Sequence, residues 1–257
     1  MWRWGSGVNE LHICAGHGGG ILGGMLLGHT CRAAIEISQY RRMVLLQRQR
    51  DGILPKFPIW DNIETFDGNP WNRITQVVCA GWPCDDLSTA GKMLGIDGPK
   101  SGLWRHVSRI IGEVRPSYVF LENTPAIVIL GLFRVLGDLA TLGYDARWAI
   151  IGGSDAGMDT DGPRFWLLAK APGKGWPSVL QSEQGINRKE GIKSKSSDYA
   201  NPPSVIERIR KHESRCGQPA ILGELDGLAN RVERLEAIGQ GQIPSLVKLA
   251  WETLSQS

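Results

Sequence analysis

The feature that most constrains this fold is the alternation of short apolar runs with helical patterns over the first two-thirds of the chain. Leu11–Ala15, Arg32–Ile37, Gln76–Ala80 and Tyr118–Leu121 have the length and apolar character of buried strands. Helical patterns separate several of these runs, and such alternation is typical of a parallel sheet. We therefore predict an α/β fold whose mostly parallel sheet carries helices on both faces.

The remaining pattern predicts helices, one edge of the sheet and an insertion. Tyr144–Ile151 and Phe165–Ala169 are expected to form a strand pair at one edge. Regular periodicity stops at Lys170 and returns near Leu225, so we expect residues 1–169 and 224–257 to form one domain and 170–223 a small irregular region. The apolar spacing predicts helices over Ile21–Leu27, Ser38–Arg50, Leu103–Val114, Ile127–Leu142 and Pro244–Leu254.

Composition excludes several classes of protein. No apolar run reaches the ~18 residues of a membrane helix, and the start lacks the apolar stretch of a signal peptide. Five Cys at uneven positions do not suggest a disulfide framework, so we expect a reducing cytoplasm. The segment 170–222 holds ten Lys or Arg against five Asp or Glu. This charge fits either a solvated loop or a surface that meets phosphates.

A glycine-dense turn, Cys14–Gly20, joins the first predicted strand to the first helix. Glycines there would let a ligand approach the backbone at the strand ends. Glu36 ends the second strand, where a carboxylate can accept hydrogen bonds from ribose hydroxyls, or can serve as an ordinary cap or ion-pair partner. Asp61 could bind an exocyclic amine or cap a turn. No Walker-type Lys follows the turn, which favours an adenosine site without phosphates over ATP.

The segment Cys79–Ser88 contains a cysteine that follows a strand and begins a polar loop. Buried structural cysteines usually lie inside an element, whereas Cys84 is placed as a nucleophile would be. Glu122 lies at the end of the neighbouring predicted strand. It is either a structural hydrogen-bonding group or a general acid that reads the edge of a base.

These segments resemble the DNA cytosine-5 methyltransferases of phage and bacterial type, over nearly the whole chain except Lys170 to about Gly223. The fold implied is a Rossmann-like sheet with a small target-recognition insertion. Six segments carry the resemblance in the family's order: Cys14–Gly19 (cofactor loop), Gly81–Cys84 (Gly-Phe-Pro-Cys), Ser101–Trp104, Glu122–Asn123 (Glu-Asn-Val), Arg164 (last Arg of Gln-x-Arg-x-Arg) and Gly239–Pro244 (Gly-Asn-x-x-x-Pro).

The resemblance implies methyl transfer from S-adenosylmethionine to carbon 5 of cytosine in double-stranded DNA. Cys84 would add to carbon 6 of a flipped-out base, Glu122 would hold N3 and the exocyclic amine, and Arg164 would contact the base oxygen or nearby backbone. Residues 85–100 would close over the base. The residues expected to bind the cofactor are Cys14, Ala15, Gly16, His17, Gly18, Gly19, Glu36, Ile37, Asp61, Asn62, Gly81, Pro83 and Gln240.

Several residues depart from the family pattern around the reacting groups. Asp85 stands where Gln normally follows the nucleophile, Gly162 replaces the first Arg of the paired motif, and Gln240 replaces Asn. His12 and Cys14 also replace the usual Asp and Phe. These changes leave open an ordinary methyltransferase with compensating features, an enzyme that uses a modified S-adenosylmethionine, and a catalytically silent DNA-binding homologue.

Two further alternatives are a tRNA cytosine-5 methyltransferase and a Rossmann oxidoreductase, although the turn lacks a clean Gly-x-Gly-x-x-Gly register. We expect a monomer in the cytoplasm of a bacterial or phage-infected cell, with no metal and no membrane association. No residue pattern indicates the recognised DNA sequence or a restriction partner.

Overall fold

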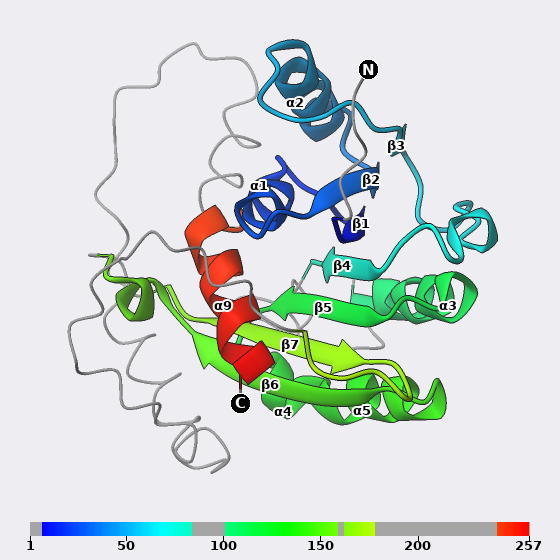
Figure 1. Cartoon of the computed structure of the whole chain (residues 1–257), viewed down its shortest axis with the longest axis vertical. Helices are drawn as coiled ribbons and strands as arrows, with labels where there is room; N and C mark the ends of the chain where they lie inside the picture. Colours follow the sequence, from blue (N-terminus) through cyan, green and yellow to red (C-terminus); the bar gives the residue numbers. More distant parts are fainter. Residues whose placement is uncertain (1–6, 84–100, 159–161, 178–240, 257) are drawn as a thin grey trace.

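A computed structural model describes residues 7–83, 101–158, 162–177 and 241–256. Its centre is a seven-stranded sheet in the order β3-β2-β1-β4-β5-β7-β6 (Figure 1). Every predicted strand is present within two residues of its expected bounds. The strands are β1 (Asn9–Ile13), β2 (Thr30–Ile35), β3 (Ile59–Trp60), β4 (Val77–Gly81), β5 (Tyr118–Asn123), β6 (Asp145–Ile151) and β7 (Arg164–Lys170).

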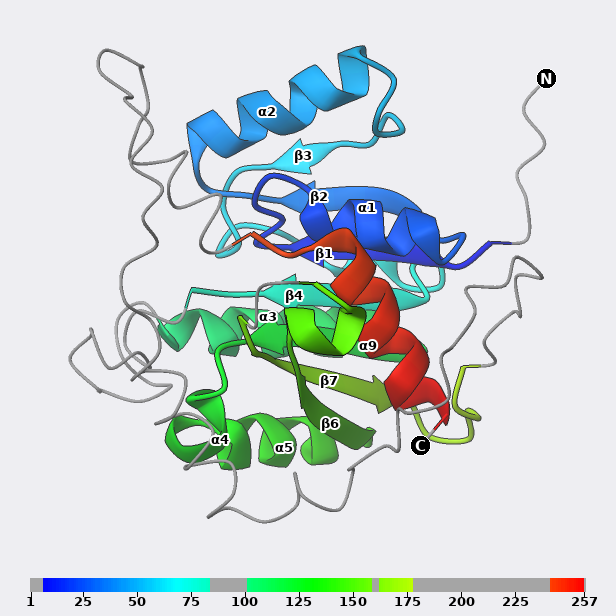
Figure 2. The same cartoon turned by 90° about the vertical axis from the view of Figure 1, so that its left-hand side faces the viewer.

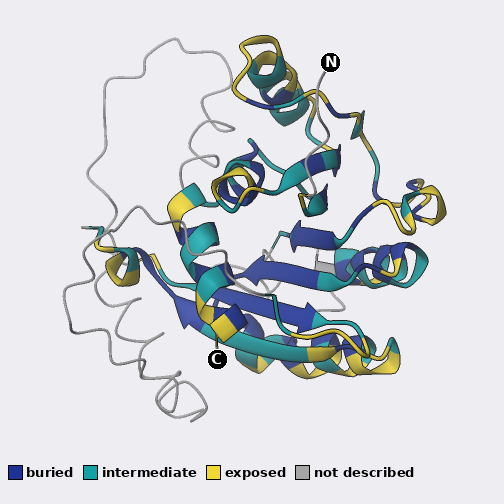
Figure 3. Cartoon of the chain, in the orientation of Figure 1, coloured by how far each residue is buried: buried dark blue, intermediate teal, exposed yellow. Residues whose placement is uncertain are grey.

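The five strands from β3 to β5 run parallel, while β7 pairs antiparallel with both β5 and β6. The predicted strand pair therefore lies at one edge, as expected. The central strands are buried on both faces, which explains their continuous apolar runs (Figure 3).

Helices cover both faces of the sheet, which confirms the prediction (Figure 2). One core joins the sheet to α3 and α5, and two smaller cores join its other face to α1, α2 and α9. The helices are α1 (Gly19–Leu26), α2 (Gln39–Arg50), α3 (Trp104–Val114), α4 (Ile127–Leu130), α5 (Leu132–Thr141) and α9 (Pro244–Gln256).

Local signals set several helix ends. The Ser38 hydroxyl accepts a hydrogen bond from the Arg41 amide and caps α2. Arg115 ends α3 in a left-handed conformation directly before Pro116. The single helix predicted over Ile127–Leu142 is wrong, because the chain breaks at Gly131 into α4 and α5. Gly131 has φ −167° and ψ −10°, a backbone conformation outside the helical region.

The order of the strands positions a ligand site. From β1 the chain proceeds outward through β2 to β3, and it then returns to place β4 on the opposite side of β1. At such a switch point the connections leave in opposite directions, and a crevice opens beyond the carboxyl ends of β1 and β4. Within the described residues, no helix is both long and apolar enough to cross a bilayer.

Candidate active site

A cleft of about 710 Å³ opens at this switch point. Its volume is within the range of roughly 300–1,000 Å³ that is common for small-molecule sites. The ends of β1, β2, β4 and β5 form its walls, together with the residues that precede α9. The predicted site residues that line it are Cys14, Ala15, Gly16, His17, Gly19, Glu36, Ile37, Gly81, Pro83, Glu122 and Arg164.

Glu36 holds the glycine turn against the start of α2. One carboxylate oxygen accepts the Gly16 N–H at 2.8 Å, and the other accepts the Ser38 N–H at 2.9 Å. Each oxygen has a second lone pair, so the carboxylate can still accept bonds from a ligand. Gly16 has φ +56°, and no atom lies within 4 Å of the position that a side chain would occupy there. Gly16 therefore fits the expectation of a backbone that is open to a ligand.

Gly19 and Gly20 also face a distant segment of the chain. A Cβ atom at Gly19 would collide with the backbone carbonyl oxygen of Gln242, and one at Gly20 would collide with the Gln242 side-chain oxygen. The lack of a side chain at these two glycines therefore leaves room for the residues that precede α9. Gly18 similarly faces the Leu45 side chain and does not line the cleft.

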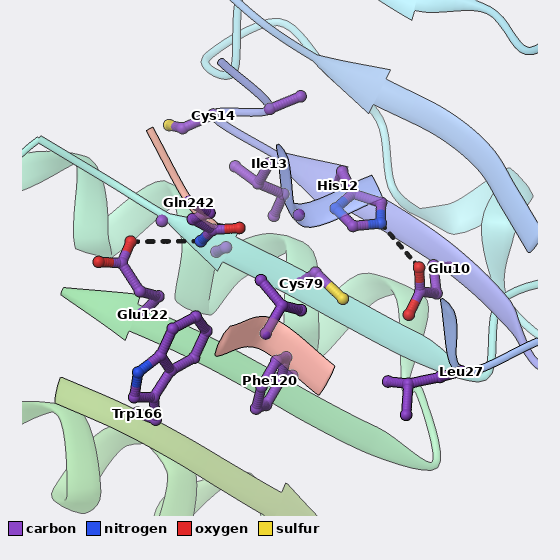
Figure 4. Close-up of a pocket in the computed structure, with 15 residues that line it drawn as sticks. Glu10, His12, Ile13, Cys14, Leu27, Cys79, Phe120, Glu122, Trp166 and Gln242 are labelled. Atoms are coloured by element: carbon purple, nitrogen blue, oxygen red, sulfur yellow. Dashed lines mark hydrogen bonds and ion pairs between the residues drawn. The ribbon is translucent and has the colours of Figure 1, made fainter. Parts of the chain in front are cut away.

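Glu122 is the buried acid of the cleft, with 9% of its surface exposed. Its Oε2 accepts a hydrogen bond from Gln242 Nε2 at 3.2 Å (Figure 4). Its Oε1 lies 3.4 Å from Arg164 Nε on the neighbouring strand β7. Burial raises the pKa of Glu122, although the Arg164 charge and the Gln242 hydrogen bond oppose the rise. Such a carboxyl is suited to hold or donate a proton.

The register of two strands brings two of the predicted motifs together. Gly81 at the end of β4 pairs directly with Glu122 on β5. The Asn123 side chain is buried and donates to the Trp82 backbone carbonyl at 3.2 Å. Asn123 thereby fixes the exit of β4, just before Pro83 and Cys84. Its position in the Glu122–Asn123 motif was the only sequence signal for this role.

Two predicted residues, Cys84 and Gln240, lie outside the described residues, as does the loop 85–100. Cys14 is present in the cleft, with φ 55°. Burial, and secondarily the Glu36 charge, raise the pKa of the Cys14 thiol to about 12. Cys14 is therefore protonated at neutral pH and is no rival nucleophile.

Asp61 and Asn62 are not among the residues that line the cleft. The Asn62 side chain accepts the Glu64 N–H at 2.9 Å, which makes it the cap of a local turn. Asp61 is exposed. Ile37, in contrast, lines the cleft with 75% of its surface exposed, and it offers an apolar wall to a ligand.

A buried network that sequence reasoning did not identify lies deeper, under the glycine turn. Glu10 Oε2 is 2.8 Å from His12 Nε2 (Figure 4), and Glu10 Oε1 is 2.7 Å from His29 Nδ1. Cys79 adjoins them, and the ligand atoms of Glu10, His12 and Cys79 lie within 4.8 Å of one another. Both carboxylate oxygens already have histidine partners, so the network is satisfied by its own hydrogen bonds.

Comparisons with known proteins agree with this geometry. The family model for C-5 cytosine-specific DNA methylase matches residues 8–220. The type II methyltransferase M.NaeI of Lentzea aerocolonigenes is 29% identical over 227 residues, which cover 80% of this chain and 54% of that protein. M2.BsuMI of Bacillus subtilis is 30% identical over 63% of this chain and 42% of its own length. The chain thus spans about half the length of these relatives.

Solved structures show the same fold. The methyltransferase EhMeth of Entamoeba histolytica aligns with a TM-score of 0.56 at 16% identity, over 68% of this chain and 56% of that one. A putative DNA modification methyltransferase encoded within an Escherichia coli prophage aligns with a TM-score of 0.52 at 19% identity, over 64% of this chain and 47% of that one.

Proposed function

This chain belongs to the C-5 cytosine-specific DNA methylase family, and we propose that it transfers a methyl group from S-adenosylmethionine to carbon 5 of cytosine in DNA. The observation that carries this proposal is the pairing of Gly81 with Glu122 across β4 and β5. Cys84 follows Gly81 by three residues in the sequence, and Glu122 is the buried acid of the cleft. Attack on a pyrimidine ring requires a nucleophile and a carboxyl that can hold a proton. In this chain the sequence places the nucleophile shortly after β4, and the carboxyl lies on the adjacent strand β5.

The residues of the cleft fit S-adenosylmethionine. Glu36 has acceptor capacity for ribose hydroxyls, Gly16 leaves its backbone open, and Ile37 offers an apolar surface to a flat base. No Walker-type Lys lies in the turn, which suits a ligand without phosphates. When bound, this cofactor supplies an electrophilic methyl group.

The proposed chemistry begins at Cys84. Cytosine carbon 5 is unreactive until the Cys84 thiolate forms a bond to carbon 6, which makes carbon 5 nucleophilic. Glu122 would hold N3 and the exocyclic amine and would favour protonation of N3 as charge develops. After carbon 5 gains the methyl group, loss of its proton restores the double bond and expels the Cys84 thiolate. The thiolate must approach the face of the ring, so the base has to leave the stacked duplex.

Arg164 would support this chemistry through Glu122. Its guanidinium lies 3.4 Å from the carboxyl, where it also reaches the wall of the cleft. Gly162, at the position of the family's first Arg, has no atom within 4 Å of its missing side chain. Arg164 is therefore the cation that we assign to this site.

A trapping experiment tests the proposal. Duplex DNA that contains 5-fluorocytosine cannot lose its substituent at carbon 5, so the enzyme should remain covalently attached in the presence of S-adenosylmethionine. We expect a denaturation-resistant complex with the wild type and none with Cys84→Ala. Cys31→Ala, at a buried cysteine of β2 that does not line the cleft, should still form the complex. A complex that persists in Cys84→Ala would refute the assignment of the nucleophile.

A further inference from the structure

Gln242 packs unusually closely against glycines in the cleft. Its side-chain amide lies between Gly20 of α1 and Gly81 at the end of β4, where any larger residue would collide with it. A Cβ atom at Gly81 would lie 2.7 Å from Gln242 Nε2 and 2.9 Å from Glu122 Oε2. A Cβ atom at Gly19 would collide with the backbone carbonyl oxygen of Gln242. Glycines on two different elements therefore make room for both the backbone and the side chain of Gln242.

In this position the Gln242 side-chain amide donates a hydrogen bond to the Glu122 carboxyl. Gln242 Nε2 donates to Glu122 Oε2 (Figure 4), while Arg164 faces Oε1 from β7. We propose that Gln242 is a positioning residue that orients the Glu122 carboxyl for the target base. This inference rests on the proposed function, in which Glu122 contacts the base. Gln242 would then act on the base only through Glu122.

The chemistry of the amide explains why glutamine suits this position. An N–H donor stabilises a carboxylate without adding a charge, whereas a second acid would repel Glu122 and a long cation would compete with Arg164. The absence of side chains at Gly20 and Gly81 leaves the room in which the amide lies against Glu122. The orientation of the carboxyl is thus set before any base arrives, which is the property that catalysis requires of a positioned group.

The same contact ties the start of α9 to the catalytic strand. Gln242 stands two residues before Pro244, the first residue of α9. The Ile243 backbone carbonyl accepts bonds from the Leu246 and Val247 amides and so continues into the helix. A displacement of α9 would therefore move the donor of Glu122.

The test compares three variants of the full chain. Gln242→Met keeps the length of the side chain and removes the donor, and Gln242→Glu keeps the shape and replaces the donor with an acid. Gln256→Met, at an exposed position near the end of α9, is the matched control. The first readout is the titration of Glu122, which NMR monitors on protein labelled at the glutamate side-chain carboxyl carbon. The variant Glu122→Gln assigns the Glu122 signal. This readout needs neither DNA nor methyl transfer.

We expect the Glu122 titration to move to higher pH in Gln242→Met, because removal of the donor takes away an interaction that lowers its pKa. Gln242→Glu should move it further in the same direction, and Gln256→Met should leave it unchanged. The rate of methyl transfer in Gln242→Met should fall on the order of tenfold at neutral pH, and the alkaline limb of its pH profile should follow the titration.

An unchanged titration in both Gln242 variants would overturn the proposal. So would a loss of activity in Gln242→Met whose pH profile matches that of the wild type, since this would indicate a structural effect only. If the wild type transfers no methyl group, the proposed function fails and the titration alone decides whether Gln242 acts on Glu122.

Discussion

Three buried carboxyl groups of this chain have different partners. Glu10 faces two histidines, Glu36 accepts two backbone N–H groups, and Glu122 lies between an arginine and an amide. Burial alone would raise the pKa of Glu10, but the charges and hydrogen bonds of His12 and His29 lower it to about 2. Burial prevails at Glu122, whose pKa is raised. Because of these partners, Glu10 is an ionised structural acid, whereas Glu122 is an acid that can hold a proton.

Glu36→Gln should weaken both the fold and cofactor binding. The amide NH2 group would face either the Gly16 or the Ser38 N–H and leave that donor unpaired. We expect a loss of about 1–3 kcal/mol in the free energy of unfolding, measured by urea denaturation. Binding of S-adenosylmethionine, followed by calorimetry, should weaken as well. Unchanged stability and unchanged affinity together would contradict the role given to Glu36.

The Glu10 network predicts a specific dependence of stability on pH. A carboxyl whose pKa is lowered on folding stabilises fully above its ordinary value of 4.5, and this contribution is lost as the pH falls towards about 2. We expect the wild type to have a higher free energy of unfolding than Glu10→Gln at neutral pH. This difference should shrink by about 3 kcal/mol as the pH falls over this range. The measurement is urea denaturation of both proteins at a series of pH values. A difference that does not vary with pH would argue against an ionised Glu10.

At the scale of elements, α1 and α9 approach so closely that glycine is required between them. A Cβ atom at Gly23 of α1 would collide with the Val247 side chain of α9. Gly23→Ala should therefore destabilise the protein by about 1–3 kcal/mol, and Val247→Ala should relieve part of that loss in the double variant. Gly137→Ala in α5 is the matched control, because nothing lies within 4 Å of that position. It should stabilise by roughly 0.5–1 kcal/mol. Equal effects at both glycines, measured by urea denaturation, would contradict this packing.

The elements themselves were largely predictable from the sequence, because each buried strand is a continuous apolar run. The break at Gly131 was not, since one glycine within a helical pattern is often tolerated. Gly16, Glu36, Gly81 and Glu122 were predicted and do meet in one cleft. Gln242 was missed because its importance comes from contacts with distant residues, and the sequence pattern had pointed to Gln240 instead.

At the scale of the whole molecule, the strand order determines where chemistry can occur. The switch point between β1 and β4 opens one cleft, and the antiparallel strand β7 delivers Arg164 to its far wall. The motifs of the sequence are far apart along the chain, yet they converge because parallel strands end at the same edge of the sheet. The family match, over residues 8–220, includes most of the residues that line the cleft.

The basic segment 170–222, most of which lies outside the described residues, predicts salt-sensitive binding to DNA. The logarithm of the binding constant should fall linearly with that of the salt concentration, by about 0.9 per phosphate neutralised. Lys193→Gln with Lys195→Gln should reduce this slope, and Lys56→Gln, a matched change elsewhere in the chain, should not. Fluorescence anisotropy with a labelled duplex measures the slope. Identical slopes in all variants would exclude Lys193 and Lys195 from contact with the DNA phosphates.

The most direct test of the central claim is the mass of the nucleosides after reaction. Duplex DNA would be incubated with the protein and S-adenosylmethionine, digested and analysed by mass spectrometry, with Cys84→Ala in parallel. We predict deoxycytidine that has gained one methyl group with the wild type and none with Cys84→Ala. Unmodified deoxycytidine from the wild type, or equal methylation by Cys84→Ala, would contradict the claim.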